Sequence, residues 1–195
     1  MALFKGIIFD KTNADIGWMN NQSAFYSHGY RTAAEKLINE YDKLGMPEKD
    51  AIVFPVIFLY RHCLEIEMKD LIYRTDRCSG NTPSEITHHE LLKVWDELDN
   101  KYSKLSEYIY PDYNFSPIED RKEIRGIIKE FNEIDGQSFT FRYPRNKKGN
   151  GSIKSIDYIS LNNFKIEINR VLNVIDNINE TICHYEVHLE EVSSA

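Results

Sequence analysis

The length, composition and charge of this chain exclude several classes of protein. Its 195 residues suit one domain, and a hydrophobic content of 42% supplies enough apolar material for a core, so a disordered chain is excluded. The net charge of −7 argues against a general nucleic-acid coat, because an acidic surface repels phosphates except where a local basic patch exists.

No segment predicts export or a membrane crossing. The longest apolar run, Ala51–Tyr60, is about half the roughly 20 residues that a bilayer-spanning helix needs. The apolar stretch at the N-terminus is too short for a secretory signal. Three widely spaced cysteines, Cys63, Cys78 and Cys183, are interpreted as reduced thiols rather than as a disulfide framework or a zinc site. We therefore expect a cytoplasmic protein with no metal and no cofactor.

The helices are expected to begin after an N-terminal arm over residues 1–21. The first helix covers roughly Gln22–Leu44, where apolar and aromatic residues recur at spacings of three and four. Gly45 and Pro47 end that pattern.

The second helix, Phe54–Arg74, is the most informative segment. Its first half is apolar on every side, which is typical of a helix at the centre of a domain. Its second half places Arg61, Glu65 and Lys69 four residues apart on one stripe, with His62 beside them. Charges are rarely buried unless they are paired. This cluster is therefore either a paired structural network or the wall of a binding cleft.

Three more helices follow. Capping-box spacings at Thr87–Glu90 and Ser116–Glu119 predict the starts of the third and fourth helices. Asp135–Gly136 ends the fourth helix, residues 136–159 are expected to form a long loop, and Ser160 starts the last helix.

These patterns predict an all-α fold. We expect an up-and-down bundle of about five helices over residues 22–190, with a long basic loop before the last helix. The sequence contains no internal repeat and no second domain boundary.

The segment Gly136–Ile156, called the basic loop below, is a local positive patch. It has no acidic residue and five cations, namely Arg142, Arg145, Lys147, Lys148 and Lys154. Phe139, Phe141 and Tyr143 are interleaved with the first of these cations, and aromatic rings beside arginines suit stacking on bases. The alternative interpretation is that the rings anchor the loop by packing while the lysines keep it solvated.

Histidines supply the candidate groups for proton transfer. His62 can titrate near neutral pH, although a histidine on an apolar helix is more often simply hydrogen-bonded. His88 and His89 would lie in the first turn of the third helix, where the helix dipole favours neutral imidazoles. The candidate catalytic residues are His62, His88 and Arg61.

Three short motifs, taken in order, resemble the HEPN superfamily, the nucleotide-binding domains of higher eukaryotes and prokaryotes. They are LEIEMKDLI, with Glu65 or Glu67 before Lys69, then HHELLKVW, with His88 or His89 before Leu91, and the Arg142-Tyr143-Pro144 element of FRYPRN. The resemblance implies a four- or five-helix bundle, often dimeric, and a place in prokaryotic defence or toxin–antitoxin systems. Ribonuclease members of the superfamily carry an arginine, then four to six residues, then a histidine. No arginine here has that spacing, which argues against RNA cleavage.

The leading hypothesis is a HEPN-like, non-catalytic protein that binds a nucleotide or RNA and forms a homodimer. Its ligand-binding residues would be Arg61, His62, Glu65, Lys69, His88, Arg142, Tyr143 and Arg145. One alternative is a dimeric protein-interaction or structural module that associates through its last helix. A further alternative is a metal-independent ribonuclease with a displaced motif, in which a histidine is the acid or base and an arginine stabilises the phosphate charge.

Overall fold

A computed structural model describes most of the chain, namely residues 9–16, 22–83, 85–109, 111–154 and 156–194. Of the expected N-terminal arm over residues 1–21, only residues 9–16 belong to the described part. They form neither helix nor strand, and nearly all of them are exposed.

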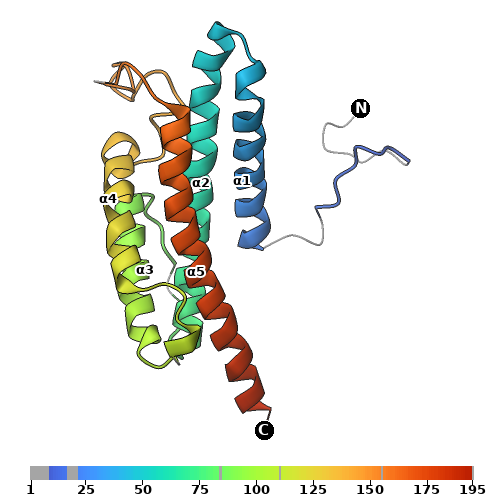
Figure 1. The fold of residues 1–195 in the computed structure, drawn as a ribbon, viewed down its shortest axis with the longest axis vertical. Helices are drawn as coiled ribbons and strands as arrows, with labels where there is room; N and C mark the ends of the chain where they lie inside the picture. Colours follow the sequence, from blue (N-terminus) through green and yellow to red (C-terminus); the bar gives the residue numbers. More distant parts are fainter. Residues whose placement is uncertain (1–8, 17–21, 84, 110, 155, 195) are drawn as a thin grey trace.

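Five α-helices make up the fold (Figure 1), and the described residues contain no strand, which confirms the predicted all-α class. The helices are α1 (Ser23–Glu40), α2 (Met46–Cys78), α3 (Leu91–Ser106), α4 (Ile118–Asp135) and α5 (Leu161–Ser193). Short 3₁₀ turns at Tyr41–Lys43 and Pro111–Tyr113 complete the helical structure. The long loop expected before the last helix lies between α4 and α5.

Helix α2 is the centre of the bundle. It packs against α1, α3 and α5, while α4 packs against α3 and α5, so α2 to α5 form a ring of four helices and α1 adds an outer layer. The core between them is apolar, with Tyr60, Leu64 and Met68 of α2, Trp95 of α3 and Leu172 of α5 all fully buried. Figure 1 shows α5 running along the bundle and continuing past it toward the C-terminus.

The start of α2 differs from the sequence-based expectation. The helix begins at Met46 rather than at Phe54, and Glu48 Oε2 accepts a hydrogen bond from Gly45 N (3.0 Å) at its start. Pro55 therefore lies inside the helix rather than in its first turn. Its side chain is exposed, which leaves the unpaired backbone carbonyl of the preceding turn near solvent.

Neither predicted capping box caps its helix. The chain around Thr87 is non-helical, and α3 starts one turn later, where Asn132 Oδ1 of α4 accepts from Leu92 N (3.3 Å). The Ser116 hydroxyl before α4 is buried and has no hydrogen-bond partner among the described residues. The prediction for α5 is confirmed, because Ser160 Oγ accepts from the backbone N–H three residues further on (3.2 Å).

Two general findings concern membranes and metals. Within the described part of the chain, no helix combines the length and the apolar character that crossing a bilayer requires. The same residues include no cluster of histidine, cysteine, aspartate and glutamate able to hold a metal ion. Cys63 and Cys78 are buried thiols, and Cys183 is an exposed one.

Candidate nucleic-acid interface

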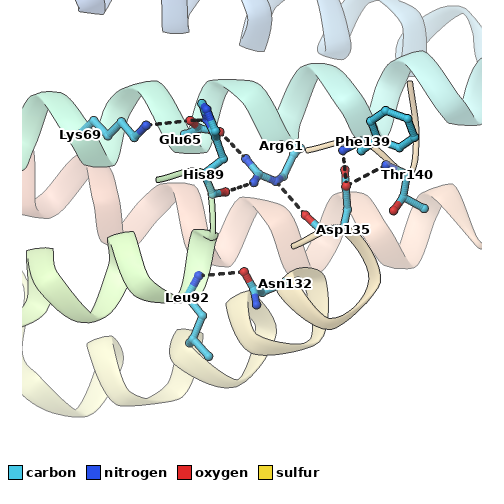
Figure 2. A network of polar contacts seen from close by, with 9 residues as sticks. All are labelled: Arg61, Glu65, Lys69, His89, Leu92, Asn132, Asp135, Phe139 and Thr140. Carbon is cyan, nitrogen blue, oxygen red and sulfur yellow. Dashed lines mark hydrogen bonds and ion pairs between the residues drawn. The ribbon is translucent and has the colours of Figure 1, made fainter. Parts of the chain in front are cut away.

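The charged stripe of α2 is enclosed by the protein. Arg61 is fully buried, and its Nη1 donates to Glu65 Oε2 (2.8 Å). Its remaining bonds reach two backbone carbonyls, that of Asp135 through Nε (3.4 Å) and that of His89 through Nη2 (Figure 2). One guanidinium thus joins α2 to the segment before α3 and to the end of α4, and each of its three nitrogens donates to the protein itself.

Glu65 is the anionic partner in this network. Its Oε1 accepts from Lys69 Nζ (2.9 Å) and pairs with His89 Nδ1 (2.6 Å). Burial alone would raise the pKa of Glu65, but the hydrogen bonds from Lys69, His89 and Arg61 outweigh burial and lower it to about 2. The side chain of His89 is 59% exposed. The contact with Glu65 holds Nδ1 of His89 and so orients the exposed imidazole.

The same network fixes the root of the basic loop. Asp135 is buried at the end of α4, and its Oδ1 accepts from Phe139 N (2.6 Å) and Thr140 N (2.8 Å). Thr140 Oγ1 donates to Ile134 O (2.9 Å), which satisfies a carbonyl of the last helical turn. Because Arg61 binds the carbonyl of Asp135, the buried network holds the point from which the loop departs (Figure 2).

Rings and one guanidinium form a stacked column, defined here as Tyr30, His62, Phe58, Arg142 and Tyr143. The edge of Tyr30 meets His62 with 4.6 Å between ring centroids, and Phe58 stacks on His62 at 5.7 Å. The guanidinium of Arg142 lies over the rings of Phe58 and Tyr143, 5.6 Å from each centroid. Arg142 and Tyr143 are the exposed end of the column.

His62 takes part in this column as a ring rather than as a charge. Burial lowers its pKa below the usual value, and the cations Arg61 and Arg142 act in the same direction against the opposing charge of Glu65. The imidazole is therefore neutral near pH 7 and suits aromatic packing.

The tip of the basic loop is a tight turn that presents its cations. Arg145 and Gly151 pair in an antiparallel bridge. Within the turn, Asn146 Oδ1 accepts from Lys148 N (2.9 Å) and Asn150 N (3.2 Å). All five cations of the loop are exposed. The backbone geometry thus holds positive side chains in solvent, next to the exposed end of the stacked column.

The structure brings most of the predicted ligand-binding residues together, but not all. Arg61, Glu65 and Lys69 form the buried network, with His62 and Arg142 in the adjoining column.

His88 lies apart from this group. Its Nε2 is 3.9 Å from Glu97 Oε2 of α3, and its Nδ1 is buried without a hydrogen-bond partner among the described residues. The candidate catalytic residues His62, His88 and Arg61 therefore do not share one open site, since Arg61 is enclosed and His62 is packed between rings.

Sequence reasoning did not identify three residues that shape this face. His89 binds Glu65, Asp135 anchors the loop and Phe58 lies between His62 and Arg142. Asp135 left a signal, because an aspartate followed by glycine is typical of a helix end that turns, and His89 was named only as an alternative to His88 in the motif HHELLKVW.

Comparisons with known proteins add no relative to this description. No protein-family model, no curated protein and no solved structure matches the chain. The resemblance to HEPN domains therefore rests on the three short motifs, and function has to be argued from the chemistry of the site.

Proposed function

We propose that this protein binds single-stranded RNA, without cleaving it, on the face formed by the basic loop and the stacked column. The observation that carries the proposal is the set of five exposed cations in a loop without acidic residues, in a chain whose net charge is −7. Such cations neutralise phosphates, and the neighbouring rings offer surfaces on which unpaired bases stack.

The position of Arg142 supports recognition of bases as well as phosphates. Its guanidinium already lies over the rings of Phe58 and Tyr143, and Tyr143 is 48% exposed, so a base can extend the column. The root of the loop is held by Asp135, so binding costs less conformational entropy than it would in an unanchored loop.

Enclosure of Arg61 favours binding over cleavage. A fully buried guanidinium whose three nitrogens donate to a carboxylate and two carbonyls is not positioned to stabilise charge on a reacting phosphate. A HEPN-like relationship and a role in prokaryotic defence or toxin–antitoxin systems belong to the same proposal, supported by the order of the motifs and by the five-helix fold. The free thiols fit a reducing compartment such as the cytoplasm.

The proposal predicts a salt-dependent interaction that the loop tip controls. The triple variant Arg145→Ala, Lys147→Ala, Lys148→Ala is expected to weaken binding of a labelled single-stranded RNA about tenfold or more at low salt. Its plot of log affinity against log salt should be shallower by about 2, since each lost phosphate contact removes roughly 0.7 from the slope. Fluorescence anisotropy at several salt concentrations measures both quantities.

A matched control removes the same number and kind of charges at the other end of the bundle. Arg77→Ala, Lys104→Ala, Lys122→Ala changes three exposed cations at the end of α2, the end of α3 and the start of α4. This variant should retain most of the affinity and the salt slope. Equal losses for the two triple variants would show that only net charge matters, and no saturable binding by the wild type would end the proposal. Intact RNA after prolonged incubation distinguishes binding from the ribonuclease alternative.

The far end of α5 favours a second proposal, a homodimer. Leu189 and Val192 lie one turn apart where α5 extends past the bundle (Figure 1), and they are 38% and 62% exposed. A hollow of about 490 Å³ beside them is lined partly by Tyr108 and Tyr113. In a dimer with a two-fold axis, a second copy of the chain would cover Leu189, Val192 and the hollow beside them.

Sedimentation equilibrium over a range of concentrations tests the dimer. The wild type should sediment as a dimer, and Leu189→Asp with Val192→Asp should give a monomer. The control Ile166→Asp changes an equally exposed apolar side chain nearer the start of α5 and should leave the dimer intact. A wild type that stays monomeric at high concentration rules the dimer out.

A further inference from the structure

A hollow adjoins the exposed end of the stacked column, between the N-terminal part of α2 and residues 140–144 and 151–153 of the basic loop. Its volume is about 550 Å³, inside the range of roughly 300–1,000 Å³ that is usual for ligand pockets. Phe54 of α2 and Phe141 and Ile153 of the loop supply apolar wall, and Arg142 and Tyr143 also line it. The hollow thus combines aromatic surface with a cation.

Phe54 is one of two exposed rings in this hollow, with Tyr143 as the other. It is 43% exposed, although α2 is otherwise the core helix, whereas Phe141 is only 7% exposed. An aromatic side chain left open beside a hollow can stack on a planar ligand. Phe54 is therefore available to a ligand, while Phe141 is held mainly by the protein.

One hydroxyl in this hollow has no partner. Ser152 Oγ is buried and forms no hydrogen bond with any described residue. Of the two other hydroxyls in the wall, that of Thr140 already donates to Ile134 O (2.9 Å), and that of Tyr143 belongs to a residue that is 48% exposed. Buried hydroxyls are nearly always hydrogen-bonded, and a serine hydroxyl can both donate and accept. Because Ser152 lines the hollow, rotation about its Cα–Cβ bond would present the hydroxyl to a ligand that carries donors or acceptors on a flat apolar body.

A nucleobase has that chemistry. Its faces suit Phe54 and Tyr143, its edge suits the Ser152 hydroxyl, and the phosphates on either side of it suit the exposed cations of the basic loop. We infer that this hollow receives one unstacked base of a single-stranded RNA, with the loop cations on the flanking phosphates. The inference rests on the proposed RNA binding and deepens it by naming the place where a base enters.

Two variants change the hollow in opposite ways. Phe54→Ala removes the exposed ring. Gly151→Phe adds a ring to the wall of the hollow and so reduces its space. The backbone should tolerate this change, because a Cβ at Gly151 would meet only Ile153 O, at 3.8 Å, and the backbone there needs no glycine conformation. Each variant is expected to weaken binding of the labelled RNA about tenfold, the effect typical of losing one base–aromatic contact.

A matched control tests whether any exposed phenylalanine has this effect. Phe25 of α1 is 38% exposed and lies outside the hollow, so Phe25→Ala should bind RNA like the wild type. Urea unfolding of all three variants shows whether each remains folded. If Gly151→Phe fails to fold, Phe54→Ala combined with Ser152→Ala takes its place.

Removal of the base itself completes the test. In a set of RNA strands with one abasic residue at successive positions, one position should weaken wild-type binding about tenfold, and Phe54→Ala should show no further loss with that strand. Wild-type affinity of Phe54→Ala and Gly151→Phe, together with lost affinity of the loop-tip triple variant, would overturn the base site and leave the RNA interface standing. Undiminished binding by all of these variants would overturn both. Displacement of the RNA by a free nucleoside monophosphate at the same affinity would overturn the assignment to a base within a strand.

Discussion

Replacement of Glu65 by alanine is expected to lower the free energy of unfolding by about 3–5 kcal/mol at pH 7, because it leaves the Arg61 guanidinium buried without its anion. The side chains of Arg61 and Glu65 are 0% and 6% exposed, so water cannot replace the lost partner without opening the core. Lys69 and His89 lose their shared acceptor in the same variant. Urea denaturation of the wild type and the variant measures the difference.

Two further variants separate this effect from an ordinary ion pair. Glu40→Ala removes the anion of an exposed pair with Lys43 and should cost less than about 1 kcal/mol. Arg61→Met combined with Glu65→Met removes both buried charges but leaves two backbone carbonyls, of residues 89 and 135, without the donor they have now. We therefore expect the double variant to recover only part of the stability. A loss for Glu65→Ala no larger than that for Glu40→Ala would contradict the enclosure of Arg61 in solution.

Glu67 should make stability fall as pH rises from 4.5 to about 7. Its Oε2 is buried and has no hydrogen-bond partner among the described residues. It lies in a cavity of about 210 Å³ between α1, α2 and α5. The charged, titratable and polar groups that line this cavity with it are Ser27, His28, Arg31, Asp70, Arg74, Asp176 and Asn179. Burial, assisted by Asp176 and opposed by Arg31, raises the pKa of Glu67 from 4.5 to about 7.

The direction of the effect follows from where the proton is lost first. Below pH 4.5 the carboxyl of Glu67 is protonated in both the folded and the unfolded chain, so it contributes no penalty. Between pH 4.5 and 7 the unfolded chain releases the proton more readily, and the penalty grows until it is complete above pH 7. The shift corresponds to at most about 3 kcal/mol.

The variant Glu67→Gln isolates this titration. Its unfolding free energy minus that of the wild type should rise by about 2–3 kcal/mol from pH 4.5 to pH 8. Urea unfolding at both pH values provides the comparison, and Glu130→Gln, at an exposed position of α4, is the control whose difference from the wild type should not change with pH. A pH-independent difference for Glu67→Gln would show that Glu67 is solvated in the folded protein.

Glu65 and Glu67 have different neighbours in the fold, and sequence periodicity does not reveal them. The stripe of Arg61 and Glu65 could be identified as either a network or a cleft wall, and the choice depended on acceptors 28 and 74 residues away from Arg61 in the chain. Glu67 belongs to the same helix but faces α1 and α5, where no free cation meets it among the described residues.

The existence of the helices could be predicted, and so could the end of α4 and the start of α5, but the starts of α2 and α3 could not. Apolar spacing identified all five, because each buries one continuous stripe. The first two turns of α2 were missed because Met46–Asp50 is polar and shows no periodicity. The start of α3 was placed too early because the capping spacing at Thr87 is a local signal. In the structure Arg61 and Asn132, from other helices, hold the chain around that start.

The error at the start of α3 also explains why the sequence did not show which of His88 and His89 belongs to the site. Inside a helix, His88 and His89 would lie on nearly adjacent faces, and nothing distinguished them. In the structure both histidines lie in a non-helical segment before α3, and they contact different elements. His89 meets Glu65, whereas His88 meets Glu97. The exposure of the five loop cations could be predicted, because a polar segment without periodicity is typical of a surface loop.

The bonds of Arg61 have a consequence for how the molecule opens. The same guanidinium binds the carbonyl just before α3 and the carbonyl that ends α4. Detaching either segment would therefore take a hydrogen-bond acceptor away from a buried charge. The root of the basic loop and the entry to α3 should thus behave as one cooperative unit of local unfolding. Fluctuations at the surface where RNA would bind are then coupled to the interior of the bundle through a single side chain.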